Sequence, residues 1–131
     1  MMRTKLCLAG VLLWTACSPR QAVVETDPRG GEEVRRRLEA AIRSDLVALL
    51  EAQESHHEEA GRYIYEAGEI GFIPSAGVEV DVLEATTGGF SALGRSGTSE
   101  CALFVGSADP PRSYAVVPGE VACRGDRASP G

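Results

Sequence analysis

The chain has 131 residues, which is enough for one domain of ordinary size but not for two. Its formal net charge of −6 argues against nucleic-acid binding, because affinity for duplexes depends on cations that contact phosphates. Apolar residues make up 44% of the chain but aromatic residues only 5%, so we expect a core built mainly from Val, Leu, Ile and Ala.

The N-terminus has the pattern of a secretory signal, a basic start followed by an apolar run. Arg3 and Lys5 precede the uncharged stretch 6–16, LCLAGVLLWTA, which is shorter than the roughly 20 apolar residues that span a bilayer. We therefore expect residues 1–16 to be a signal peptide. A buried helix of the mature domain is the alternative, and the polar, proline-containing stretch that begins at Ser18 argues against it.

The run ends in Leu13-Trp14-Thr15-Ala16-Cys17. This segment resembles the lipobox of bacterial lipoproteins, in which a cysteine after small residues is lipidated and becomes the mature N-terminus. Thr15, Ala16 and Cys17 match the pattern, whereas Trp14 stands where the family usually has an aliphatic residue. The resemblance implies that Cys17 is acylated and attaches the chain to membrane lipid in the cell envelope. In a cell with two membranes, Ser18 after the cysteine implies sorting to the outer membrane or its periplasmic face. Two or more acyl chains would anchor the chain stably. Ordinary signal cleavage, which leaves Cys17 as a free thiol, is the alternative.

After Cys17 we expect a flexible linker and then a long helix. Residues 17–31 include two prolines and a glycine pair and show no periodicity, which is typical of a linker. An amphipathic helix is predicted over Glu32–Ala60, and Gly61 is well placed to end it. Its apolar stripe repeats at three- and four-residue steps and consists of Val34, Leu38, Ala41, Ile42, Leu46, Leu49 and Ala52. Because this stripe covers one side of the helix only, a partner surface must follow.

A basic run, Arg35–Arg37, lies near the start of this helix. It could indicate a contact with phosphate or a lipid headgroup, but acidic residues flank it on both sides. We interpret it as a solvated helix face. The remainder of the mature chain contains no polybasic patch that would hold it to anionic lipid.

The second half of the chain predicts strands. Val78–Val82 alternates apolar and charged residues, the period of a half-buried strand. Further short β-prone runs are separated by Gly, Pro and Ser, at Gly88–Leu93, Cys101–Val105, Tyr114–Val117 and Val121–Cys123. A helix followed by a strand meander predicts an α+β domain over residues 32–125, with the helix packed on a small antiparallel sheet. Residues 126–131 are expected to be a disordered tail.

The four cysteines differ in their expected roles. Cys7 lies in the signal peptide and Cys17 is the expected lipid site, which leaves Cys101 and Cys123 in an oxidising compartment. We predict a disulfide between them, which closes a loop of about 22 residues and stabilises the fold by roughly 3 kcal/mol. Two free thiols are the alternative.

Two motifs are candidates for chemistry. His56 and His57 point about 100° apart on a helix, and the i+4 partner of His56 is Ala60, so we expect no metal site. One histidine should pack at the helix end while the other faces solvent. Gly89–Ser96 has the spacing of a phosphate-binding loop but carries Arg95 in place of lysine, and we interpret it as a hairpin connection with positive-φ glycines. We therefore expect no enzyme activity, no catalytic residues, no cofactor and no small-molecule substrate.

Several short motifs follow one another in a fixed order over residues 40–124, about two-thirds of the chain. They are RSDL at 43–46, AQE at 52–54, GRY at 61–63, FIPSAGV at 72–78, GFSA at 89–92 and ECALFVG at 100–106. In this order they resemble the globular head of type IV pilin-like proteins, which implies a structural or contact role. Pilins begin with a continuous hydrophobic helix that is replaced here by a lipobox and a polar tether, so filament assembly in the usual manner is not expected.

Together these features predict a lipid-anchored extracytoplasmic protein that is an envelope subunit, an adhesin component or an accessory of a membrane assembly. Its partners would be membrane lipid, through Cys17, and an unidentified protein. The alternatives are a small periplasmic ligand-binding module, which needs a discrete apolar pocket between helix and sheet, and a soluble secreted minor pilin-like protein. We expect Ser107–Arg112, an exposed loop between Cys101 and Cys123, to make the contacts, because loops on rigid scaffolds commonly carry binding.

Overall fold

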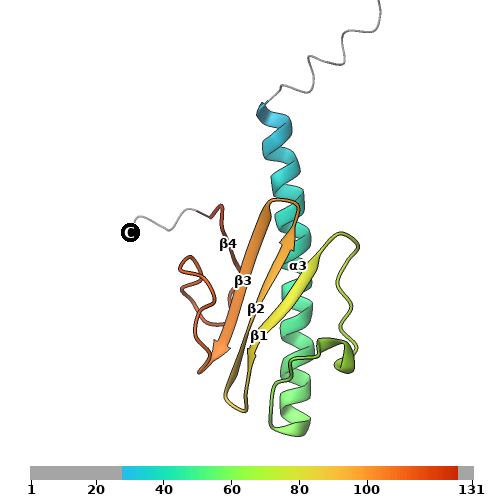
Figure 1. The fold of residues 1–131 in the computed structure, drawn as a ribbon, viewed down its shortest axis with the longest axis vertical. Coiled ribbons are helices and arrows are strands. Elements are labelled where there is room, and N and C mark those ends of the chain that lie inside the picture. Colours follow the sequence, from blue (N-terminus) through green and yellow to red (C-terminus); the bar gives the residue numbers. More distant parts are fainter. Residues whose placement is uncertain (1–27, 127–131) are drawn as a thin grey trace, which may run out of the picture. The chain divides into compact units, whose positions relative to one another are not determined.

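A computed structural model describes residues 28–126 (Figure 1). The predicted signal peptide, Cys17 and most of the predicted linker lie outside this range. The chain divides into two units, Met1–Val34 and Arg35–Gly131. In the described part of the chain, no helix is both long and apolar enough to cross a membrane. The elements are helix α3 (Pro28–Ala60), the 3₁₀ helix η3 (Ala67–Ile70) and strands β1 (Glu79–Ala85), β2 (Gly89–Ser96), β3 (Ser99–Gly106) and β4 (Ala122–Cys123).

Helix α3 starts four residues before the predicted start and ends where predicted. Pro28 suits a first helical position, because it has no N–H group to satisfy and its fixed φ matches the helix. The glycine pair that follows costs roughly 1 kcal/mol per residue relative to alanine but does not forbid a helix. At the other end, Gly61 adopts a φ of 77°, and its N–H donates to the carbonyl of His57 at 2.8 Å. A left-handed glycine is a common way for a helix to end.

The four strands form one antiparallel sheet in the order β1-β2-β3-β4. The β2–β3 register is unbroken from Gly89↔Gly106 to Ser96↔Ser99, whereas the β1–β2 register shifts between Val82 and Glu84. The last strand is short and pairs with β3 through Cys101↔Cys123 and Ala102↔Ala122. The predicted α+β class, one long helix packed on a small antiparallel sheet, is confirmed.

Two predictions about the strands were wrong. Tyr114–Val117 is not a strand but part of the connection between β3 and β4, where the N–H of Ala115 donates to the carbonyl of Arg112 at 3.0 Å. The stretch Gly89–Ser96 is not a hairpin connection, because all of it forms β2. The hairpin turn comes just after it, and there Gly97 adopts a φ of 58°.

Gly94 lies in the interior of β2 for a packing reason. A Cβ at this position would come within 2.5 Å of Cγ2 of Ile42 and 3.5 Å of Cγ of Leu46 on helix α3. The helix and the sheet therefore approach so closely here that no side chain fits between them. A glycine inside a strand often marks such a close approach of another part of the chain.

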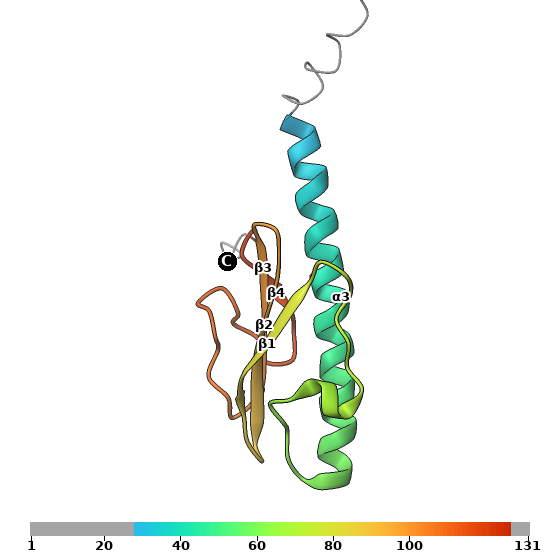
Figure 2. The same ribbon diagram turned by 45° about the vertical axis from the view of Figure 1, so that its right-hand side comes forward.

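The sheet is covered on both faces. Helix α3 lies on one face, and the connection between β3 and β4 lies on the other (Figures 1 and 2). Alternate residues of the strands belong to two separate clusters. The larger one contains Ile42, Leu46, Leu49, Tyr63, Phe72, Val78, Phe90, Ala92, Cys101, Leu103, Val105 and Cys123. The smaller one contains Leu93, Ala102, Phe104 and Ala115, with Tyr114 and Ala122 packed against it.

Two buried polar side chains of α3 fix the long connection between α3 and β1. Gln53 is fully buried, and its amide group donates to the carbonyl of Ile64 at 2.6 Å and accepts from the N–H of Ile64 at 3.0 Å. The carboxylate of Asp45 accepts from the N–H and the hydroxyl of Ser75 at 2.7 and 2.8 Å. Buried polar groups are stable only when they are hydrogen-bonded, so these bonds determine the path of the connection.

Candidate functional site

The connection between β3 and β4, residues 107–121, is the candidate interaction site, and we call it the outer loop. A disulfide between Cys101 and Cys123 closes it, and both cysteines are fully buried in paired strands. The predicted disulfide is therefore confirmed. Within the loop, the N–H of Gly119 donates to the carbonyl of Phe104 on β3 at 2.7 Å. The loop is thus attached to the sheet by the disulfide between its flanking strands and by the backbone hydrogen bond of Gly119.

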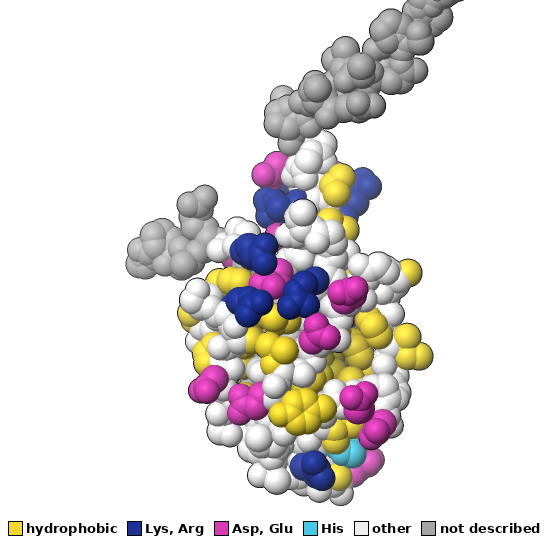
Figure 3. Space-filling model, viewed as in Figure 1, with side chains coloured by type: hydrophobic (Ala, Val, Ile, Leu, Met, Phe, Trp, Pro, Cys, Tyr) yellow, Lys and Arg dark blue, Asp and Glu magenta, His cyan; other side chains and the backbone are white. Residues whose placement is uncertain are grey.

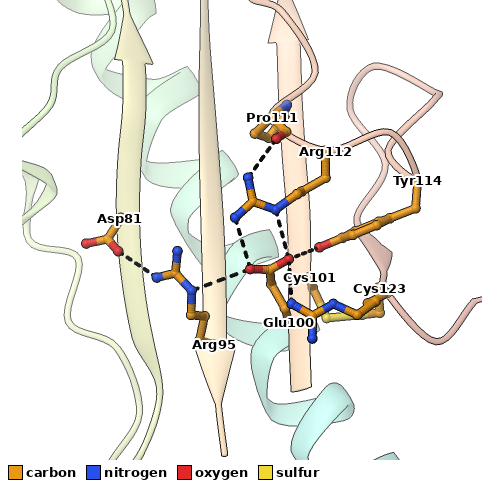
Figure 4. Close-up of polar contacts among 9 residues, drawn as sticks. Asp81, Arg95, Glu100, Cys101, Pro111, Arg112, Tyr114 and Cys123 are labelled. Atoms are coloured by element: carbon orange, nitrogen blue, oxygen red, sulfur yellow. Dashed lines mark hydrogen bonds and ion pairs between the residues drawn. A yellow bond between two sulfur atoms is a disulfide. The ribbon is translucent and has the colours of Figure 1, made fainter. Parts of the chain in front are cut away.

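A buried carboxylate on β3 is the second attachment of the outer loop (Figure 4). Only 4% of the Glu100 side chain is exposed. Its Oε1 accepts from the hydroxyl of Tyr114 at 2.6 Å and from Nε of Arg112 at 3.1 Å, and its Oε2 accepts from Nη2 of Arg112 at 3.3 Å. Two further arginines contact the same carboxylate, Arg95 with Nε at 3.4 Å and Arg124 with Nη2 at 3.2 Å. These five residues form the Glu100 cluster.

The electrostatics of the Glu100 cluster keep its carboxylate ionised. Burial by itself would raise the pKa of Glu100, but the hydrogen bonds from Tyr114, Arg112 and Arg124 outweigh it and lower the pKa to about 2. For Tyr114, burial and the hydrogen bond to Glu100 both raise the pKa of the phenol. Tyr114 therefore remains a hydrogen-bond donor and Glu100 remains an acceptor at ordinary pH.

The Glu100 cluster fixes the conformation of the outer loop. Arg112 and Tyr114 both come from the loop and both end on Glu100, and Nη1 of Arg112 donates to the carbonyl of Pro111 at 3.0 Å. Held in this way, the loop exposes apolar side chains, with Val116 73% and Val117 44% exposed. The predicted contact segment Ser107–Arg112 is exposed along most of its length. Its last residue, however, helps to hold the loop on the sheet.

Arg43 of α3 attaches the residues that follow the outer loop. Its guanidinium group donates to the carbonyl of Val121 at 3.0 Å and to both carboxylate oxygens of Asp126 at 2.8 Å. Burial by itself would raise the pKa of Asp126, but the N–H of Cys123 and the guanidinium group of Arg43 lower it. Asp126, the first residue of the predicted tail, is thus paired with the helix. Residues 127–131 lie outside the described range.

The two histidines have different surroundings. His57 stacks on Tyr63 with ring centroids 4.4 Å apart, and its Nε2 lies 2.8 Å from the carbonyl oxygen of Thr87. Packing of one histidine at the helix end is thus confirmed. His56 is half-buried beside Glu59 and Glu69 rather than turned fully to solvent. Within residues 28–126, no group of three or more His, Cys, Asp and Glu side chains is arranged to hold a metal ion.

The interface between helix and sheet is filled by side chains. Ile42, Leu46 and Leu49 of the helix and Phe90 and Leu103 of the strands are all fully buried there. One hollow of about 420 Å³ borders β1 and η3 instead.

The Glu100 cluster was not foreseen from the sequence. Arg95, Arg112 and Arg124 are separated by more than ten residues each, so no local run of charge indicates that they meet. One signal was available. Glu100 stands next to Cys101 at the start of a strand that is otherwise apolar, and a charged residue at such a position is seldom buried without partners.

No protein-family model and no curated protein matches this chain.

Proposed function

We propose that this chain is a lipid-anchored extracytoplasmic protein with a pilin-like structural or interaction role, which contacts its protein partner through the outer loop. The observation that carries the proposal is the outer loop itself. A disulfide and the buried carboxylate of Glu100 fix a loop that exposes Val116 and Val117. Fixing a loop in advance reduces the conformational entropy that binding costs, which is what a contact surface requires.

Two further observations support the extracytoplasmic part of the proposal. The Cys101–Cys123 disulfide is of a kind that persists mainly in oxidising compartments. The N-terminal apolar run that ends in Thr15-Ala16-Cys17 resembles a lipoprotein signal. The proposed role needs no catalytic residues, and the filled interface between helix and sheet gives less support to a ligand-binding module.

Intact mass spectrometry of the protein from the membranes of its own host tests the anchor. We expect a chain that starts at Cys17, carries added acyl mass and gains two hydrogen masses on reduction. A Cys17→Ser variant should be lost from the membrane fraction. An unlipidated wild-type chain with a different start would contradict the anchor and favour a soluble secreted minor pilin-like protein.

Cross-linking in the same membranes tests the loop. We expect Val116→Ser combined with Val117→Ser to abolish a specific cross-linked product while leaving the thermal midpoint within about 2 °C of wild type. The matched control is Ile73→Ser, which removes a side chain that is 83% exposed in the α3–β1 connection. Loss of the product in the control as well, or its persistence in the loop variant, would contradict a contact through the outer loop.

A further inference from the structure

The outward side of the Glu100 cluster is a surface of arginine side chains. Glu100 itself is 4% exposed, whereas the side chains of Arg95, Arg112 and Arg124 are 40%, 41% and 61% exposed. The carboxylate is therefore buried while its three arginine partners reach the surface, and Figure 4 shows Arg95 and Arg112 turned toward Glu100 from different strands and loops. On the face drawn in Figure 3, basic side chains gather in the upper part, with acidic side chains among them.

The charges of this surface do not balance. Three guanidinium groups contact the carboxylate of Glu100, and the second carboxylate in the group, Asp81, pairs with Nη1 of Arg95 at 2.9 Å. One positive charge is left over, on a chain whose net charge is −6. Because the three cations converge on one carboxylate, they also repel one another. An additional anion bound above them would offset both the excess charge and the repulsion.

Hydrogen-bond donors remain available for such an anion. A guanidinium group carries five N–H donors in a fixed plane. Among the hydrogen bonds and ion pairs of the described residues, Arg124 takes part only through its Nη2, and Nη2 of Arg95 takes part in none. Arg112 uses all three of its nitrogens on Glu100 and Pro111 and contributes mainly charge.

We propose that Arg95, Arg112 and Arg124 form a binding site for a phosphate group, carried either by a lipid headgroup or by a soluble phosphate ester. Phosphate suits the site because its several acceptor oxygens can contact two arginines at once, and arginine pairs with it bidentately. Glu100 holds the guanidinium groups from below, so little ordering is needed on binding. This site does not depend on acylation at Cys17, and its test can fail without affecting the proposed function.

Calorimetric titration with inorganic phosphate at constant ionic strength tests the site directly. The protein is the full chain with Cys17→Ser, so that no acyl chain contributes. We expect Arg124→Gln to weaken phosphate binding about tenfold, and Arg124→Lys to weaken it severalfold, because lysine keeps the charge but loses the planar fork. The control is Arg62→Gln, which removes an exposed arginine elsewhere in the domain and should change nothing.

Vesicle sedimentation then distinguishes the two sources of phosphate. Binding to phosphatidylglycerol vesicles that falls severalfold with Arg124→Gln, and exceeds binding to phosphatidylcholine vesicles, would assign the site to a lipid headgroup. Binding of inorganic phosphate and glycerol phosphate that depends on Arg124, without such vesicle binding, would assign it to a soluble ester. If neither ligand responds to Arg124, or if Arg62→Gln has the same effect, the phosphate site is disproved.

Discussion

The two faces of the sheet are closed by different kinds of interaction. On the helix side, fully buried apolar side chains such as Ile42 and Leu46 pack so tightly that Gly94 has no room for a Cβ. On the other side, a small apolar cluster around Phe104 is supplemented by the buried carboxylate of Glu100 and its hydrogen-bond partners. The disulfide joins the two ends of the outer loop but belongs to the helix-side cluster. The helix side thus depends on apolar burial and a disulfide, and the other side mainly on charged contacts.

This difference predicts that the two faces respond to different conditions. The apolar packing of the helix side depends little on pH, although the disulfide in its cluster makes it sensitive to redox state. The outer loop should be sensitive to both, because it needs an ionised Glu100 and an intact disulfide.

The largest effect is expected from the helix side. Leu46→Ala removes a fully buried side chain and should lower the free energy of unfolding by roughly 2–5 kcal/mol, the sum of lost burial and a remaining cavity. The matched control is Val47→Ala at the next position, which is 44% exposed and should cost less than about 1 kcal/mol. Chemical denaturation of both variants measures the difference. Equal losses would show that the helix does not form the main core with the sheet.

The disulfide should come next. Replacement of both Cys101 and Cys123 by alanine should cost roughly 3 kcal/mol, because the closed loop spans 22 residues. We expect hydrogen exchange to increase first in the outer loop, while the amides of α3 remain protected. The N–H of Gly119, bonded to the carbonyl of Phe104, is a suitable reporter. If hydrogen exchange increased equally in α3 and in the outer loop, the disulfide would stabilise the whole domain and not mainly the outer loop.

The contrast between the faces also explains what the sequence could predict. The helix and strand β1 follow from periodic patterns that are local, so α3 and the α+β class were predicted correctly. Gly94 was misread because glycine is equally typical of turns, and only the close approach of Ile42 shows why it belongs in a strand. Tyr114 lies in a β-prone run, but its hydroxyl bonds to Glu100, and this long-range contact outweighs local propensity.

A change at Glu100 should have a smaller, pH-dependent effect. Glu100→Gln should lower the free energy of unfolding by about 2 kcal/mol at neutral pH. This loss is smaller than is usual for a broken buried ion pair, because solvent screens the half-exposed arginine partners. The folded-state pKa of about 2 lies below the ordinary value of 4.5. The contribution of Glu100 is therefore complete above about pH 4.5 and is lost as the pH falls toward 2.

Denaturation curves of wild type and Glu100→Gln between pH 2 and 7 measure this contribution as the difference between the two proteins. We expect the difference to shrink as the pH falls through this window, because only the wild type loses an ionised carboxylate there. A difference that stays constant down to pH 2 would mean that the glutamate acts through its packing and not through its charge.

The smallest effect is expected from the tyrosine hydroxyl. Tyr114→Phe keeps the ring that packs on the small apolar cluster but removes the donor 2.6 Å from Oε1 of Glu100, at a cost of about 1 kcal/mol. Because that bond helps to lower the pKa of Glu100, the acid loss of stability should shift to higher pH. Tyr65→Phe, at a tyrosine that is 56% exposed, is the control and should leave the stability and the pKa of Glu100 unchanged.

An NMR titration of the Glu100 carboxyl reports the pKa directly, and an unshifted pKa in Tyr114→Phe would show that the arginines alone keep the carboxylate ionised. The outer loop would then be held by charge, and its hold would weaken with added salt as well as with acid.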